Sequence, residues 1–153
     1  MVIAYNEELS TYEPCLVTKS YIHHNTPQLM DVYLNDGSII HITPGHPILT
    51  MEGWKSRDIE LSLIEHMTVA EWLTLDDIII GGQDIYYSIV RIEEYNLPDN
   101  YDTYNIEVER LHTFIADNIV VHNMKAHYDT GGYTGEWDEG IPGTNDGRLA
   151  ILH

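Results

Sequence analysis

Short runs of β-branched and aromatic residues, separated by tight-turn residues, most constrain how this chain can fold. Two of the separators, Asn35-Asp36-Gly37 and Asp117-Asn118, are rich in residues that tolerate the left-handed backbone conformation of hairpin turns. The predicted strands are residues 31–34, 38–42, 87–95, 104–108, 114–116 and 119–121. Most of the aromatic residues are tyrosines, which suit half-buried strand faces. The sequence therefore predicts an all-β fold.

Only one segment favours a helix, and the end of the chain favours neither helix nor strand. Ser62 with Glu65, and Thr68 with Glu71, match the capping-box pattern of helix starts, which predicts a short helix between residues 62 and 73. Residues 129–147 are rich in glycine and turn formers, which is typical of a loop or a disordered tail. We therefore expect one domain over residues 1–123 and a tail over residues 124–153.

Charge and cysteine content exclude several classes of function. Lysine and arginine total 7 against 25 aspartates and glutamates, a formal charge of −18. This balance argues against nucleic acid or an anionic membrane as a partner, because both bind basic patches. No apolar run is long enough to span a bilayer, and residues 1–10 lack the pattern of a signal peptide. The single cysteine, Cys15, fits a reducing compartment, so we expect a cytoplasmic protein.

The His122-Asn123 pair at the end of the last predicted strand carries the most chemistry. The side-chain amide of an asparagine can attack its own carbonyl, which forms a succinimide and breaks the next peptide bond. That slow reaction needs a polarised carbonyl, a proton donor for the leaving amine and a fixed geometry. His122 precedes the asparagine directly, and His112 lies on the predicted neighbouring strand. A buried strand that merely ends in His-Asn is the simpler interpretation of the dipeptide alone.

Two motifs, in order along the chain, favour the chemical interpretation. Residues 103–109, then His112-Thr113-Phe114, then Val120-Val121-His122-Asn123 resemble the C-terminal end of the Hint family. This family comprises inteins, bacterial intein-like domains and hedgehog-type autoprocessing domains. Upstream, residues 36–50 followed by Gly53-Trp54 resemble the family's Thr-x-x-His segment, with Thr43 and His46 at the motif positions. The resemblance implies the Hint fold, a flattened horseshoe of β-hairpins with both chain junctions near its centre.

The resemblance also implies roles for the matching residues. His46 would promote the N-terminal acyl shift, with the Thr43 hydroxyl orienting it. His112 would assist cyclisation of Asn123, and His122 would polarise the scissile carbonyl or protonate the leaving amine. Asn123 itself would be the self-cleaving residue. The implied activity is a single-turnover self-cleavage that needs no cofactor and no metal.

The sequence departs from splicing inteins in three places. Met124 stands where a splicing intein carries Cys, Ser or Thr, so cyclisation of Asn123 would release the tail without ligation, as in bacterial intein-like domains that mainly cleave. Asn105 occupies a position where many inteins carry an aspartate, and a neutral amide cannot shuttle a proton as a carboxylate does. Residues 1–6 resemble the strand that follows the family's opening Gly-Asp-x-Val turn, so we expect the opening segment, with its first-residue nucleophile, to lie before residue 1.

The missing nucleophile makes this chain resemble the C-terminal portion of a Hint domain, either split or truncated. The expected partner is then a complementary N-terminal intein segment, needed for trans-splicing or N-terminal cleavage. Cys15 is a poor substitute, because a domain starting there would lose a strand and because a thiol also needs a suitable microenvironment.

The tail points to a host protein and to an alternative function. Residues 129–135 and 147–153 resemble a segment near the end of phage tape-measure and minor tail proteins, so the host would be a phage tail protein incorporated in a virion. The alternative is an inactive Hint remnant within that structural protein. A metal-dependent hydrolase using several of the nine histidines is a further alternative. The sequence lacks His-x-x-x-His spacing, and His23 and His24 would point to opposite faces of a strand.

Overall fold

The computed structural model describes residues 1–122, and strands make up most of this part of the chain. The strands are β1 (Val2–Asn6), β2 (Thr11–Cys15), β3 (Val17–His23), β4 (Gln28–Leu34), β5 (Ile39–Ile42), β6 (Ile48–Thr50), β7 (Gly53–Ser56), β8 (Glu71–Trp72), β9 (Ile78–Ile80), β10 (Tyr86–Asn96), β11 (Thr103–Val108), β12 (Thr113–Ala116) and β13 (Ile119–His122). The helices are α1 (Ile59–His66) and the short 3-10 helix η1 (Gly82–Asp84). The predicted all-β class is therefore confirmed. Neither helix among residues 1–122 is long and apolar enough to cross a membrane.

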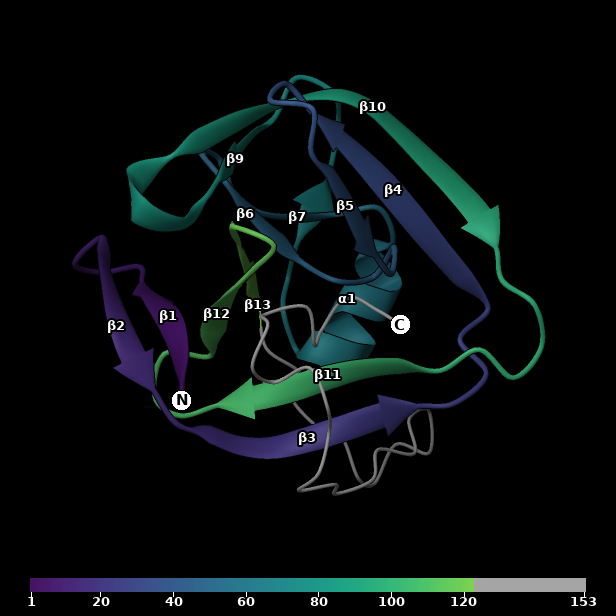
Figure 1. Cartoon of the computed structure of the whole chain (residues 1–153), viewed down its shortest axis with the longest axis horizontal. Helices are drawn as coiled ribbons and strands as arrows, with labels where there is room; N and C mark the ends of the chain where they lie inside the picture. The colour runs from purple at the N-terminus through teal and green to yellow at the C-terminus, as the bar shows by residue number, and fades with distance from the viewer. Residues whose placement is uncertain (123–153) are drawn as a thin grey trace.

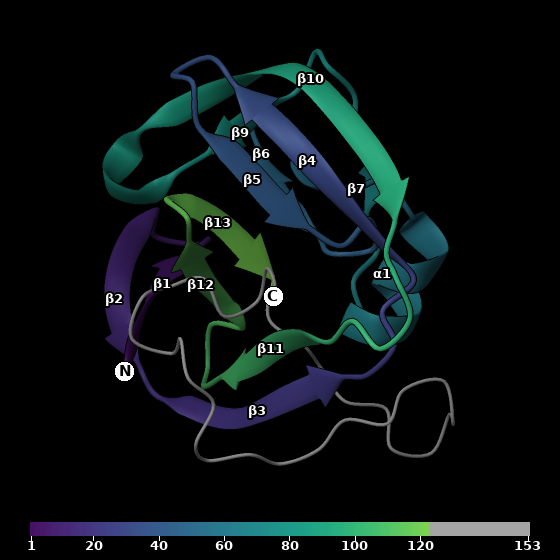
Figure 2. The same cartoon turned by 45° about the vertical axis from the view of Figure 1, so that its right-hand side comes forward.

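The strands form one large bent sheet and two separate ribbons. The large sheet has the order β12-β13-β6-β9-β10-β4-β5, and β7 joins it by pairing with β6 and with β8. The ribbons are β1-β2 and β3-β11. Figures 1 and 2 show the long β4-β10 pair on one side of the molecule and the β3-β11 ribbon on the other, with α1 and the β12-β13 hairpin between them. The last described strand therefore ends in the interior of the fold.

Both predicted hairpins are present with the expected turns. β4 pairs with β5 across residues 35–38, where Gly37 has a φ of +91° and the Asp36 carboxylate accepts a hydrogen bond from the Ser38 backbone N–H at 2.9 Å. β12 pairs with β13 across Asp117 and Asn118, whose φ angles are 48° and 67°. Two successive positive φ angles match the right-handed twist of the flanking strands. The predicted strands at 87–95 and 104–108 are confirmed as β10 and β11.

The predicted helix exists, but its predicted boundaries were wrong. α1 begins at Ile59 because the Asp58 side chain caps it by accepting the Leu61 backbone N–H at 3.1 Å. It ends at His66 because Met67 adopts the left-handed conformation, with φ 50° and ψ 35°. Ser62 therefore lies inside the helix and does not cap it, and the second capping box follows the helix end. The predicted tail over residues 124–153 lies outside the described residues.

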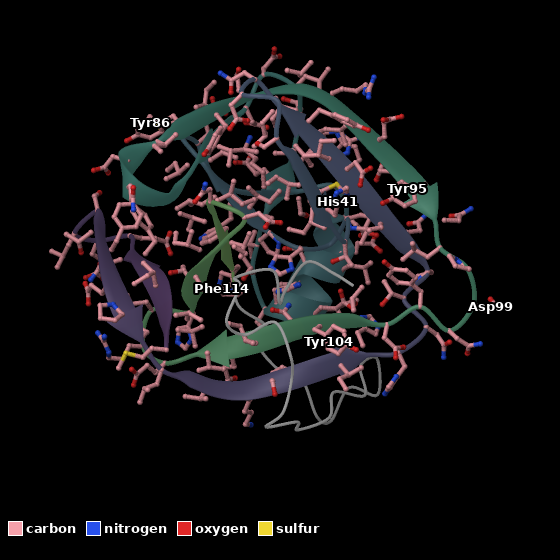
Figure 3. All side chains as sticks on the ribbon, viewed as in Figure 1. His41, Tyr86, Tyr95, Asp99, Tyr104 and Phe114 are labelled. Carbon is pink, nitrogen blue, oxygen red and sulfur yellow. The ribbon has the colours of Figure 1, made fainter. Side chains whose placement is uncertain are left out.

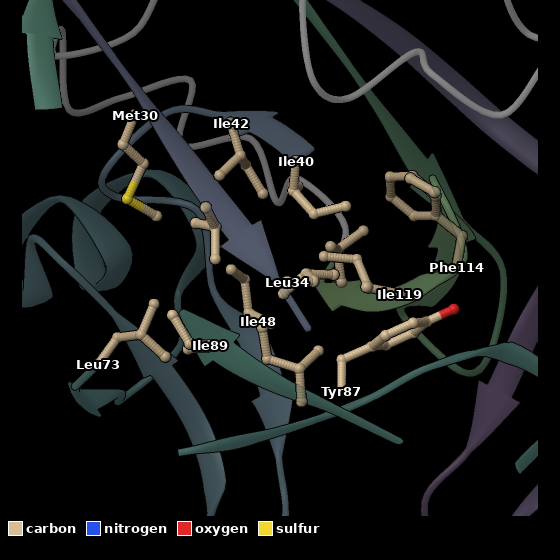
Figure 4. Close-up of a cluster of buried hydrophobic side chains, with 14 of the residues drawn as sticks. Met30, Leu34, Ile40, Ile42, Ile48, Leu73, Tyr87, Ile89, Phe114 and Ile119 are labelled. Carbon is tan, nitrogen blue, oxygen red and sulfur yellow. The ribbon is translucent and has the colours of Figure 1, made fainter. Parts of the chain in front are cut away.

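A single large apolar cluster fills the space between the sheets. It includes side chains from β4, β5, β6, β9, β10, β12 and β13, several of which Figure 4 labels. Phe114 from β12 lies near the middle of the molecule, whereas Tyr86 and Tyr95 lie towards its rim (Figure 3). A smaller cluster gathers Tyr5, Leu49 and Val120, with Trp54 packed against them. These two clusters fix β6 and β13 side by side.

Candidate functional site

A tight turn presents His46 and packs against the start of α1. The His46 backbone N–H donates to the Thr43 carbonyl at 3.1 Å, and the Pro44 carbonyl accepts from the backbone N–H groups of Arg57 and Asp58 at 2.9 and 3.0 Å. Gly45 lies so close to the helix that a Cβ built on it would sit 2.6 Å from the Leu61 Cβ. Position 45 therefore has no space for a side chain unless α1 moves.

β13 brings His122 to the same place from the other end of the chain. Val121 pairs with Ile48 of β6, and the His122 backbone N–H donates to the Pro47 carbonyl at 3.2 Å. The residues that follow His46 thus run antiparallel to the last residues of β13. His122 itself is buried, and the edge of its ring meets the Trp54 indole at a centroid distance of 5.0 Å.

A buried hydrogen bond joins the two histidines. His46 Nε2 lies 2.8 Å from the His122 carbonyl oxygen. Because a carbonyl oxygen only accepts, Nε2 must carry the proton and donate it. Burial lowers the pKa of His46 to about 3, so the ring is neutral at physiological pH. His46 is therefore a fixed hydrogen-bond donor to the carbonyl of the peptide bond that links His122 to Asn123.

A third histidine, His66, completes the group. Its ring lies 4.5 Å from that of His46 and 6.4 Å from that of His122, measured between centroids. His66 is the last residue of α1 and is only 1% exposed, like His46. Sequence reasoning gave His66 no role because no family motif includes it.

His112 lies at the entry to β12, one residue before the Thr113–His122 pair. The register pairs Thr113 with His122, so His112 is one residue beyond the last pair, at the end where His122 leads to Asn123. His112 has a φ of 58°, an uncommon left-handed conformation for a non-glycine residue. Thr113 is tied to β1, because its hydroxyl donates to the Tyr5 carbonyl at 2.7 Å and accepts from the Tyr5 backbone N–H at 2.8 Å.

The remaining predicted site residues have different outcomes. Thr43 supplies the carbonyl that closes the His46 turn, while the predicted orienting role of its hydroxyl stays a prediction. Asn105 lies on β11 opposite Tyr21, and its side-chain oxygen accepts the Ile106 backbone N–H at 2.8 Å. Asn123 lies outside the described residues.

Cys15 occupies a site that disfavours a nucleophile. The residue is fully buried at the end of β2, opposite Val2, and its sulfur accepts a hydrogen bond from the Arg110 guanidinium at 3.4 Å. Burial raises the pKa of the Cys15 thiol above its usual range, with the Arg110 charge opposing that shift. At neutral pH the reactive thiolate is therefore scarce.

The adjacent histidines His23 and His24 meet different carboxylates. His23 Nδ1 lies 3.5 Å from Glu65 of α1, and His24 Nδ1 lies 3.2 Å from Asp102. Burial raises the pKa of Glu65 to about 7, and the negative charge of Asp58 adds to the shift. Burial lowers the pKa of His23, so both members of the His23–Glu65 pair favour their neutral forms. Within residues 1–122, no three or more His, Cys, Asp or Glu side chains gather in a way that could hold a metal ion.

Comparison with solved structures identifies the fold. The chain is similar to the DnaB intein of Synechocystis sp. PCC 6803, with 25% identity and a TM-score of 0.61 over 80% of this chain and 77% of that one. It is also similar to a bacterial intein-like domain of Clostridium thermocellum, with 20% identity and a TM-score of 0.62 over 79% of each chain. A third similar structure is the DnaX mini intein of Spirulina platensis, with 23% identity and a TM-score of 0.60 over 80% of each chain. No protein-family model matches the sequence, and no curated protein matches it either. Residues 1–122 thus adopt the Hint fold of inteins and bacterial intein-like domains.

Proposed function

We propose that this chain is an intein-like autoprocessing domain that cleaves its own backbone after Asn123. The observation that carries the proposal is the buried hydrogen bond from His46 Nε2 to the His122 carbonyl. It anchors the backbone immediately before the asparagine, in a place shielded from water and next to two further imidazoles. The intein structures to which the fold is similar give independent support.

The proposed step needs no reagent from outside the chain. The Nδ2 atom of Asn123 attacks the carbonyl carbon of the same residue, and the bond from that carbon to the Met124 nitrogen breaks. Nδ2 loses one proton, and the departing Met124 nitrogen gains one, so the step is balanced. The products are residues 1–123 ending in a succinimide and residues 124–153 with a free amino terminus.

Each histidine has a distinct part in this step. His46 is a fixed neutral donor, so it orients the peptide unit that precedes Asn123 and draws electron density from it. His112, at the open end of the Thr113–His122 register, would relay the proton from the attacking amide to the leaving nitrogen. His122, braced by Trp54, would polarise the scissile carbonyl.

The expected outcome is cleavage without ligation. The Met124 side chain is a thioether, which cannot accept an acyl group at neutral pH. Residues 124–153 would therefore be released without ligation. We propose that they belong to a host that is a phage tail protein. Splicing or N-terminal cleavage would require a complementary N-terminal segment that supplies a Cys or Ser nucleophile, since Cys15 is buried.

Incubation of the purified chain, followed by intact-mass analysis, tests the proposal. We expect a product that begins at Met124 and a partner that ends in a succinimide. Asn123→Ala should abolish both, whereas Asn96→Ala, which alters an exposed asparagine on β10, should leave the rate unchanged. A second arm adds a synthetic N-terminal segment led by cysteine. If no product begins at Met124 in either arm, the alternative of an inactive Hint remnant is correct.

A further inference from the structure

Helix α1 is amphipathic in the opposite sense to an ordinary surface helix. Its apolar residues Ile59, Leu61, Leu63 and Ile64 are 36–52% exposed, while its buried residues are Ser62, Glu65 and His66. Burying polar side chains costs free energy unless hydrogen bonds compensate for the lost water. Hydrophobic packing alone would therefore favour a helix orientation with the apolar residues buried and the polar residues exposed. Such local conflicts between sequence pattern and fold are expected at functional sites.

The backbone around His66 fixes its position firmly. The Ser62 hydroxyl donates to the Thr68 carbonyl at 3.0 Å, and the Thr68 hydroxyl donates to the His66 carbonyl at 2.9 Å. Met67 turns the chain sharply in the left-handed conformation immediately afterwards. The helix therefore ends where its last side chain meets the His46 ring.

We propose that His66 is a positioning residue of the self-cleaving site, which packs on the His46 ring and holds its Nε2–H on the His122 carbonyl. The three imidazoles come from three elements, the turn before β6, the end of α1 and the end of β13. The His66 ring covers one side of His46 at 4.5 Å and stands edge-on to His122 at 6.4 Å. Removing it opens a space beside His46 that water can enter and that lets the ring rotate.

Besides burial, a Coulombic interaction with His122 also lowers the pKa of His46. Glu65, next to His66 on α1, faces His23 of β3, and Asp58 at the helix start acts on Glu65 through its charge. The groups that face His46 are the ring of His66 and the backbone and side chain of His122. Loss of the His66 ring is therefore expected to change the hydration of His46 more than its charge environment.

The inference rests on the proposed self-cleavage, so the experiment has one arm that needs no cleavage. In that arm, the full chain with Asn123→Ala is labelled with ¹⁵N-histidine, and the ring nitrogen shifts of His46 are followed against pH. With His66 present, His46 should remain the neutral Nε2–H form down to about pH 4, in keeping with the low pKa that burial imposes. His66→Ala should give mixed tautomers and titration nearer the usual range, and His66→Phe should preserve the wild-type signal.

The second arm measures cleavage of the chain with Asn123 intact. Compared with wild type, His66→Ala should cleave about tenfold more slowly or worse, while His66→Phe should stay within about threefold, because a ring of similar shape still packs on His46. His24→Ala is the matched control, since His24 is a 43% exposed histidine paired with Asp102, and it should change nothing.

The outcomes separate the two proposals. If the wild-type chain never cleaves but the His46 signals respond to His66 as described, the proposed function fails and the positioning role stands. If wild type cleaves and a folded His66→Ala matches its rate, or His66→Phe is as slow as His66→Ala, the positioning role is wrong. If His66→Ala does not fold, His66→Phe decides, because altered His46 tautomers in that folded variant would also contradict the role.

Discussion

At the scale of single residues, the proposed cleavage depends on one hydrogen bond. His46→Ala removes the donor to the buried His122 carbonyl and leaves a cavity. The carbonyl then has no hydrogen-bond donor from His46, and the backbone immediately before Asn123 is no longer anchored. We expect the cleavage rate to fall by about 10²-fold or more and the free energy of unfolding to fall by about 1–3 kcal/mol. Intact-mass kinetics and urea unfolding measure the two effects.

The matched variant is His46→Gln, which retains a side-chain N–H of comparable reach. It should recover part of the lost rate, because a fixed donor is required and not a titrating imidazole. An equal loss of cleavage rate in His46→Ala and His46→Gln would contradict the donor role. A wild-type cleavage rate that changes with pH around a pKa near 6.5 would indicate instead that His46 shuttles protons.

Glu65 makes the stability of the fold depend on pH. Its pKa of about 7 lies above the ordinary value of 4.5, so the folded protein holds a proton that the unfolded chain releases between these pH values. The full stability is therefore present below about pH 4.5 and declines as the pH rises through 7. Glu65→Gln should be more stable than wild type by about 2–3 kcal/mol at pH 8 and equal to it near pH 4.

Urea unfolding at several pH values measures this difference. Glu93→Gln, a change of an exposed carboxylate on β10, is the control and should leave the pH profile as it is. A constant gap between Glu65→Gln and wild type at every pH would show that packing, and not ionisation, distinguishes the two side chains.

At the scale of elements, the His46 turn and α1 behave as one unit because of Gly45. A methyl group at position 45 would sit 2.6 Å from the Leu61 Cβ, a distance that real side chains do not adopt, so α1 must shift. We expect Gly45→Ala to lower the free energy of unfolding by about 1–3 kcal/mol. It should also slow cleavage, because the contact joins the turn that carries His46 to the helix that carries His66. Thermal unfolding and cleavage rates measure both effects.

Gly82→Ala provides the comparison for this prediction. A Cβ there would lie 3.3 Å from a methyl group of Ile115, which can give way slightly. Its effect on stability and cleavage should be clearly smaller than that of Gly45→Ala. If the two variants behave alike, the close approach of the turn to α1 does not matter for the site.

The elements also show what the sequence could and could not predict. The turn at Asp36-Gly37 and the turn at Asp117-Asn118 were predictable because their conformational demands are local. His46 and His122 were named through resemblance, and the fold brings them together, while their part in cleavage stays a prediction. The role proposed for His66 was not predictable. Long-range packing buries the polar face of the helix that carries His66, and no local sequence pattern indicates that packing.

At the scale of the whole molecule, distant parts of the chain enclose the end of β13. β1 reaches the β12-β13 hairpin through the paired hydrogen bonds between Tyr5 and Thr113, and β6 flanks β13 on its other side. The site therefore exists only when the first strand, the central turn and the last strand have all assembled. Cleavage should depend on the complete fold and not on the His-Asn pair alone.

The same molecule carries a formal charge of −18, so folding concentrates like charges. Raising NaCl from about 0.1 M to about 1 M shortens the screening length from about 10 Å to about 3 Å, which should weaken this repulsion and raise the free energy of unfolding by on the order of 1 kcal/mol. Urea titrations at each salt concentration measure it. A variant with Glu8→Lys, Glu71→Lys and Asp99→Lys, all at exposed positions, reduces the net negative charge from −18 to −12 and should respond less to salt. Equal salt responses in the two proteins would assign the effect to salting-out of apolar surface and not to charge.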